Sequence, residues 1–212
     1  MKKIISLLLA VVMLATLCCA CGGDKSADKV KVIDIALSEE SYAFCVGKDD
    51  AELLTKVNEY LTKIKGDGTF DAICNKYFGD GKPSGVTSAA EDASKDQLVV
   101  ATNAAFAPFE YKEGDTYYGV DMEIMAALAE SLGRELVISN MDFDAVCLSV
   151  GQSKADIAMA GLTVNEKRKE YVNFTVSYYN AAQMLVVNEK VTAFDNCKTA
   201  EEVLAVLAKE VK

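Results

Sequence analysis

Between residues 98 and 187, short apolar segments alternate with segments whose apolar residues recur at helical spacing. Strands that alternate with helices of this length form a parallel sheet. We therefore expect an α/β fold, with a doubly wound, mostly parallel sheet and helices on both of its faces. Ligands bind such sheets beyond the carboxyl ends of the strands, which here are residues 103–106 and 161–168. The expected strands are 98–103, 135–140, 156–161 and 183–187, and the expected helical segments are 121–132, 145–150 and 165–170.

A second structured block lies ahead of this sheet. Residues 41–46 are apolar and aromatic and predict a buried strand. Two amphipathic helices are expected next, at 49–66 and 69–79, each with a polar capping residue at its start and a glycine at its end. Residues 80–97 then change to mainly Gly, Ser, Ala, Asp and Lys, a composition typical of a solvated linker.

The amino terminus carries an export signal. Two lysines precede an apolar run and a small residue, Ala20, so we expect residues 1–20 to be a signal peptide. Cys21 and the glycines after it resemble the cleavage and lipidation site of a bacterial lipoprotein, although Cys18 stands where that motif usually has Leu. The expected arrangement is a lipid anchor on Cys21 with a polar tether over residues 21–32. The alternative is an ordinary secretory signal cut near Ala20, which also exports the chain.

Charge and composition exclude several classes of partner. The chain has 22 basic and 32 acidic residues and no His. An acidic surface repels nucleic acid, so we expect no nucleic-acid partner, and the acidity otherwise serves solubility. Without His, and without a CxxC spacing after Cys21, we expect neither a metal site nor a cofactor.

Four cysteines follow Cys21, namely Cys45, Cys74, Cys147 and Cys197. Four thiols can pair in an oxidising compartment. The first three, however, each replace an apolar residue in a periodic run, which favours buried free thiols. The sequence leaves both possibilities open.

The segment AGLTVNEKR predicts a site for a carboxylate. Gly161 ends a strand, Thr163 offers a hydroxyl, and Arg168 follows within the first turn of a helix. Backbone N–H groups at a helix start, together with a guanidinium, suit a carboxylate. The alternative is that Arg168 is one more solvated charge in the run KRKE.

Two aromatic residues and an amide are expected beside this site. Asn103 and Phe106 follow the first strand, and Phe143 follows the strand 135–140. Two rings beside a carboxylate clamp suit a small zwitterion whose side chain must be enclosed. The alternatives are that both rings belong to the core and that Asn103 only caps a turn.

These motifs resemble one protein family. The stretches LVVATNAAFAPFEYKEGDTYYGVDMEIMAALAESLG and MDFDAVCLSVGQSKADIAMAGLTVNEKRKEYVNFTVSYY resemble the first lobe of the family 3 extracellular solute-binding proteins, the polar amino-acid receptors of ABC importers. The resemblance implies a type II periplasmic-binding-protein fold. It also implies that Arg168 holds the ligand α-carboxylate with help from Gly161 and Thr163, and that Phe106 and Phe143 flank the side chain. Family members commonly have an acid at the position of Asn103, so its neutrality favours a neutral polar ligand.

The segment 33–79 resembles the carboxyl-terminal tail of the same family, which returns from the second lobe to complete the first. We therefore expect a permuted order, with tail 33–79, linker 80–97 and main lobe 98–187. Residues 188–212 are expected to leave the hinge and begin a second lobe that stops at Lys212. Most of lobe two, with its acid for the ligand amino group, is then missing.

The expected function is that of a lipid-anchored receptor at the outer face of the cytoplasmic membrane, without enzymatic activity. It would bind a free amino acid and pass it to the permease subunits of an ABC transporter. Two alternatives stay open. One is a dehydratase-like enzyme on the same fold, and the other is a remnant of a split or tandem gene that no longer binds.

Overall fold

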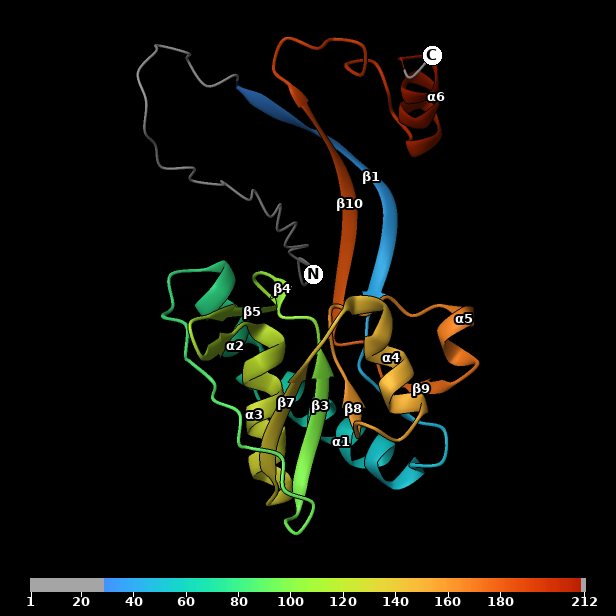
Figure 1. The fold of residues 1–212 in the computed structure, drawn as a ribbon. Coiled ribbons are helices and arrows are strands. Elements are labelled where there is room, and N and C mark those ends of the chain that lie inside the picture. The colour runs from blue at the N-terminus through green and yellow to red at the C-terminus, as the bar shows by residue number, and fades with distance from the viewer. Residues whose placement is uncertain (1–28, 211–212) are drawn as a thin grey trace, which may run out of the picture.

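The computed structural model describes residues 29–210, so the expected signal peptide and Cys21 lie outside the described residues. Figure 1 shows a body of helices and strands from which a two-stranded ribbon extends, with one helix at the far end. The helices are α1 Ala51–Gly66, α2 Thr69–Phe78, α3 Val120–Leu132, α4 Phe143–Gly151, α5 Glu166–Lys169 and α6 Ala200–Glu210. The strands are β1 Val30–Tyr42, β2 Cys45–Gly47, β3 Gln97–Thr102, β4 Ala105–Phe106, β5 Glu110–Glu113, β6 Thr116–Tyr118, β7 Glu135–Asn140, β8 Ile157–Ala158, β9 Val172–Phe174 and β10 Tyr179–Asn188.

The central sheet has five strands in the order β7-β3-β8-β2-β9. Strand β3 runs parallel to both of its neighbours, β7 and β8. Strand β2 is antiparallel to β8 and to β9, so the sheet is mixed, with four strands in one direction and β2 running against them. The predicted α/β class is confirmed, and the carboxyl ends of β3, β7 and β8 meet at one edge as expected.

Strand β2 and helices α1 and α2 come from the amino-terminal block and are part of this body. Helix α1 begins where expected, since the Asp50 side chain accepts a hydrogen bond from Leu53 N at 2.9 Å. Its apolar face is buried in the same core as β3 and α3. Helix α2 ends at Gly79, also as expected. The amino-terminal block therefore supplies both an interior strand of the central sheet and part of the core.

A long ribbon of β1 and β10 was not expected. The two strands pair antiparallel from Val30 and Asn188 to Tyr42 and Tyr179, with irregular register between Ile33 and Ser38. Strand β1 thus begins inside the segment predicted to be a polar tether. Residues 183–187, predicted for the parallel sheet, lie in this separate ribbon instead. Both predictions were wrong for the same reason, because β1 and β10 form their backbone hydrogen bonds with each other.

Helix α6 covers this ribbon. Val203 of α6 is fully buried and packs with Ile33 of β1 and with Phe194. These residues form a small core separate from that of the central sheet. Among the described residues, no helix is long and apolar enough to span a membrane.

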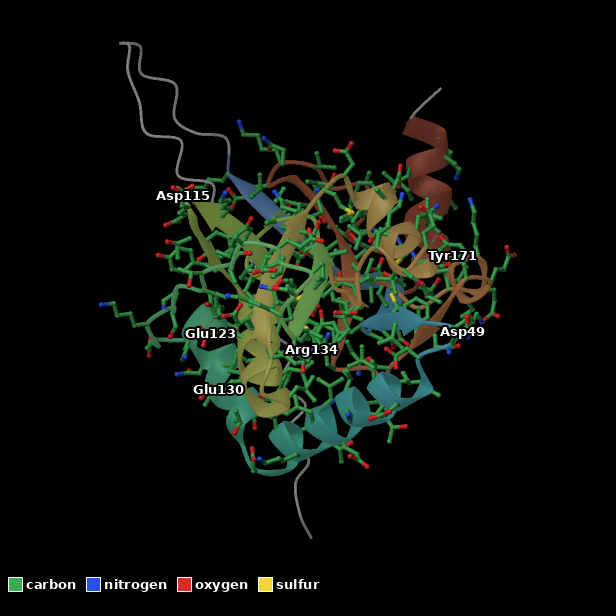
Figure 2. All side chains as sticks on the ribbon, turned by 60° about the horizontal axis from the view of Figure 1, so that its bottom comes forward. Asp49, Asp115, Glu123, Glu130, Arg134 and Tyr171 are labelled. Atoms are coloured by element: carbon green, nitrogen blue, oxygen red, sulfur yellow. The ribbon has the colours of Figure 1, made fainter. Side chains whose placement is uncertain are left out.

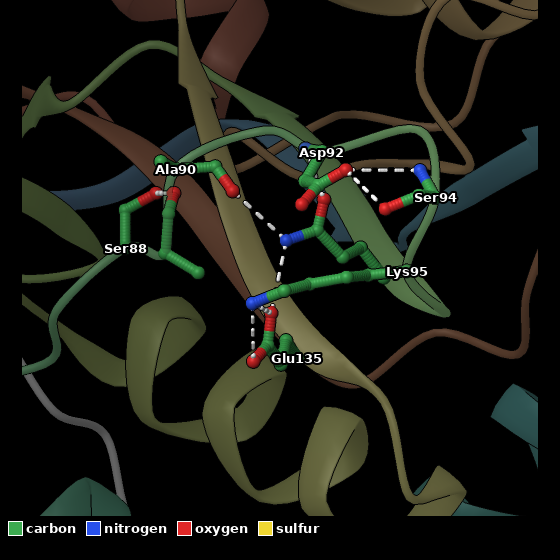
Figure 3. A network of polar contacts seen from close by, with 8 residues as sticks. Ser88, Ala90, Asp92, Ser94, Lys95 and Glu135 are labelled. Atoms are coloured by element: carbon green, nitrogen blue, oxygen red, sulfur yellow. Dashed lines mark hydrogen bonds and ion pairs between the residues drawn. The ribbon is translucent and has the colours of Figure 1, made fainter.

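The segment 80–97 is less solvated than its composition predicts. Val86 is buried and exchanges backbone hydrogen bonds with Tyr117. Further along, Gln97 Nε2 donates to Ala90 O at 2.9 Å, and Lys95 pairs with Glu135 at the start of β7 (Figure 3). These contacts fix the segment along the body, so it is an ordered connection.

Candidate ligand-binding site

Arg168 lies in the short helix α5. The Asn165 side chain caps this helix by accepting a hydrogen bond from Arg168 N at 2.9 Å. The guanidinium donates from Nη1 to Thr163 O at 2.9 Å and lies over the Phe143 ring, with Cζ 5.2 Å from the ring centroid. Among the ion pairs of the described residues, none includes Arg168. One face of the guanidinium is thus held by an aromatic ring and one N–H by a carbonyl, which leaves further N–H donors for an anion.

Phe143 is the first residue of α4, which begins two residues earlier than expected. Phe143 is 42% exposed and belongs to none of the hydrophobic clusters of the described residues. The alternative that this ring is a core residue is therefore wrong.

Phe106 lies against Gly161. A Cβ atom at Gly161 would stand 2.8 Å from Phe106 Cε1, and the glycine has a φ of +50°. A side chain at position 161 would therefore meet both steric and backbone strain. The Phe106 ring stacks on that of Phe109 at 5.6 Å and remains 40% exposed. Both aromatic residues predicted from the sequence thus offer exposed surface near the ends of β3, β7 and β8.

Asn103 follows β3, where its Nδ2 donates to Met141 O at 2.8 Å. This contact joins the ends of β3 and β7. The bond joins residues 38 positions apart, so it is a long-range contact and not the local turn cap that the sequence left open. An amide tied to the main chain in this way keeps only part of its hydrogen-bonding capacity for a ligand.

Thr163 contacts a residue that sequence reasoning missed. Its hydroxyl donates to Glu40 Oε2 at 3.4 Å, and its backbone bridges to Tyr42. Burial, followed by the charge of Glu40, raises the pKa of Tyr42 to about 12. Glu40 appears in the sequence only as one of two adjacent acids, and nothing in that pattern predicts its position beside Thr163.

Two buried acids lie behind Gly161. Asp121 Oδ2 accepts from Tyr178 Oη at 2.9 Å and from Gly161 N at 3.4 Å. Glu110 is 1% exposed. Two buried oxygens, Glu110 Oε2 and Asp121 Oδ1, have no hydrogen-bond partner. Burial is the largest cause that raises the pKa of both carboxyls. A proton held on Glu110 and directed at Asp121 would satisfy the two unpartnered oxygens.

The burial of Glu110 removes one carboxylate that could have paired with a cationic ligand. Glu110 could have supplied that charge had it faced the site, but it is buried beside Asp121. Asp142 and Asp144 are exposed on either side of Phe143.

Two hollows in the described part of the chain lie away from these residues. The larger, about 400 Å³, is lined by Asp49, Val150 and Tyr171 among others, at the end of α4 opposite to Phe143. Figure 2 labels Asp49 and Tyr171 near one another, in the blue-green and orange parts of the chain. The candidate residues line neither hollow. Within residues 29–210, no group of three or more acids and cysteines is arranged to hold a metal ion.

Residues 98–210 match the family described as bacterial extracellular solute-binding proteins, family 3, and the chain belongs to this family. It is 35% identical over 102 residues to the arginine-binding extracellular protein ArtP of Bacillus subtilis, a match covering 48% of this chain and 40% of that protein. It is 34% identical over 82 residues to cyclohexadienyl dehydratase of Pseudomonas aeruginosa, with coverages of 38% and 31%. Among solved structures, the arginine-bound domain 1 from TmArgBP matches with a TM-score of 0.39 and 28% identity, over 54% of this chain and 92% of that one. The chain spans less than half the length of these two curated relatives.

Proposed function

We propose that this chain provides the amino-acid-binding lobe of an ABC-importer receptor. The observation that carries the proposal is the Arg168 guanidinium, which is hydrogen bonded to Thr163 O and stacked on Phe143 at the strand ends. A guanidinium oriented in this way matches the planar carboxylate of a free amino acid. Relatives of this chain include proteins named for arginine and histidine binding, which supports the ligand class.

Each site residue has a proposed role. Arg168 binds the α-carboxylate with help from Gly161 and Thr163. Phe106 and Phe143 enclose the ligand side chain, and their exposed rings supply the apolar surface that this role needs. The remaining proposed site residue is Asn103, which follows β3 and is bonded to Met141 O.

We further propose that segment 33–79 is a permuted tail of lobe one and that a second lobe binds the ligand amino group. In this proposal a lipid on Cys21 anchors the receptor at the outer face of the cytoplasmic membrane, where it meets the permease subunits. Dehydration of a bound acid needs an enclosed site with a positioned acid or base, whereas in this proposal one lobe alone leaves the ligand exposed to water on one side. A lack of turnover of prephenate-like acids would separate the receptor from the dehydratase alternative.

The lobe alone should bind an amino acid with a dissociation constant of about one millimolar or weaker. About three charge-assisted hydrogen bonds give about 5 to 9 kcal/mol in total. Association costs about 4 kcal/mol or more, and a ligand exposed to water on one side gains little from burial. The measurement is an NMR titration of residues 22–212 with glutamine. Micromolar affinity of a monomer would contradict the proposal that one lobe supplies only half of the binding site.

In the same titration, Arg168→Ala should weaken binding by about ten- to a hundredfold, because it removes charged hydrogen bonds. Lys167→Ala is the matched control, since it removes the neighbouring exposed charge from the same helix and should leave affinity unchanged. If both variants behave alike, Arg168 is not the carboxylate ligand.

Specificity should favour a neutral polar amino acid over arginine, lysine or histidine. Asn103 is neutral, Glu110 is buried away from the ligand, and a buried cation without a partner is strongly disfavoured. Competition between glutamine and arginine tests this expectation. Arginine displacing glutamine would contradict it and would group this chain with its arginine-binding relatives, with Glu40, Asp142 or Asp144 as the candidate acids.

A further inference from the structure

Two cysteines from distant parts of the chain meet in the core. Cys45 lies on β2 and Cys147 on α4, with 3.7 Å between their sulfur atoms. Cys45 is fully buried and Cys147 is 4% exposed. The other two cysteines of the described residues lie apart from them, Cys74 against the main core and Cys197 beside α6.

The elements that carry this pair are held firmly. Strand β2 is hydrogen bonded on both sides, with Cys45 opposite Ala158 of β8 and Phe174 of β9. Helix α4 packs on the same sheet through Val146 and Val150, in a cluster rich in small side chains. The backbone of these two elements therefore places the two sulfur atoms in contact.

We propose that Cys45 and Cys147 form a disulfide bond, which links the amino-terminal block to the helix that carries Phe143. A family of exported proteins meets oxidising conditions in which disulfides persist. A disulfide requires a sulfur–sulfur distance of about 2.05 Å, so the two side chains must close from contact to bonding distance.

The chemistry needs an external disulfide as oxidant. The thiolate of one cysteine attacks this disulfide, which forms a mixed disulfide and releases one thiol. The second cysteine then loses its proton and attacks the protein sulfur of the mixed disulfide, which releases the second thiol. Two protein thiols are thereby oxidised, and one external disulfide is reduced to two thiols. Because both cysteines are buried, the exchange takes place as β2 docks during folding or when α4 opens locally.

Exposure and the charge of Arg168 favour Cys147 as the first nucleophile. The contact with Cys45 lowers the pKa of Cys147, and the charge of Arg168 lowers it further. The same contact, together with burial, raises the pKa of Cys45. Cys147 is also the more exposed of the two. Cys45 is then the resolving thiol.

The test is peptide mapping of the unmutated protein over residues 22–212, refolded in a buffer of oxidised and reduced glutathione. Trypsin should release residues 32–48 joined to residues 135–154, lighter by two hydrogen atoms than the sum of the separate peptides. Cys74 and Cys197 should remain free for alkylation. The melting temperature should rise by on the order of 5 to 10 °C on oxidation, since the bond closes a long loop.

Matched variants separate this bond from other thiol chemistry. On oxidation, the Cys74→Ser and Cys197→Ser variants should still lose two hydrogen atoms and show a higher melting temperature. The Cys45→Ala and Cys147→Ala variants should show neither change on oxidation. Alkylation of all four thiols in denaturant after refolding would overturn the proposal, as would a link from Cys45 to any cysteine other than Cys147. Mapping of the unmutated protein decides the question even if an alanine variant fails to fold.

Discussion

A protein that lacks residues 41–79 will not unfold cooperatively. The deletion removes β2 from the middle of the sheet, which leaves β9 without its partner. It also removes Phe44, whose ring stacks on Tyr178 at 4.4 Å and whose N–H donates to Thr175 Oγ1. Both contacts of Phe44 join positions more than 130 residues apart, so the main lobe has no local replacement for them.

The energetic loss is as large as the stability of a whole domain. Five buried side chains of α1 and α2 disappear, and burying each contributes about 1.5 to 3 kcal/mol. Their sum is comparable to a typical unfolding free energy of about 5 to 15 kcal/mol. The five are Leu53, Val57, Leu61, Ile64 and Ile73.

Thermal melting followed by near-ultraviolet circular dichroism measures this effect. The matched control is deletion of residues 189–210, which removes α6 and its separate small core and should leave a sharp transition. A synthetic peptide of residues 41–79 added to the shortened protein should restore that transition. If the protein without 41–79 melts as sharply as the parent, the block is not part of the lobe.

The second large effect is a fall in stability as the pH rises from about 5 to about 8. Burial raises the pKa of Glu110 and Asp121 above the values of 4.5 and 3.8 that such groups have when exposed. In this range the folded protein therefore binds more protons than the unfolded chain, and its unfolding free energy falls as pH rises. Each group that stays protonated only when folded contributes up to about 1.4 kcal/mol per pH unit.

Glu110→Gln tests the cause of this slope. The Gln amide cannot ionise, and it can donate to Asp121 as the protonated acid would, so this variant should show a flatter pH dependence and equal or greater stability at about pH 8. Glu130→Gln is the control, because it neutralises an exposed acid on α3 (Figure 2) and should keep the parental slope. Urea unfolding at several pH values gives the slopes. Equal slopes for the parent and Glu110→Gln would show that the buried pair does not control them.

Sequence patterns predicted the helices well because local signals determine them. The apolar spacing of α1 and the aspartate before it gave both its buried face and its start. The end of α3 follows from Gly133, which adopts a left-handed conformation with a φ of 70°. These features depend on neighbours within a few residues, so the sequence alone contains them.

The ribbon and the inner part of the site could not be predicted in this way. Strand β1 alternates apolar and polar residues only weakly, and its partner β10 lies about 140 residues later. Glu110 and Asp121 read as surface acids because nothing local indicates their burial. The roles of Glu40 beside Thr163 and of Asn103 between β3 and β7 likewise follow only from the meeting of distant segments.

The pairing of Val30 with Asn188 has a consequence for chain order. Neighbouring strands are about 4.8 Å apart, so a domain with adjacent ends can be grafted from Asn188 to Val30 in place of residues 189–210. The chain could then be opened within segment 80–97, and its order would become 98–188, graft, 30–79. The same pairs of contacts would form in either order. The pairing of these two strand ends is therefore what makes the lobe compatible with more than one chain order.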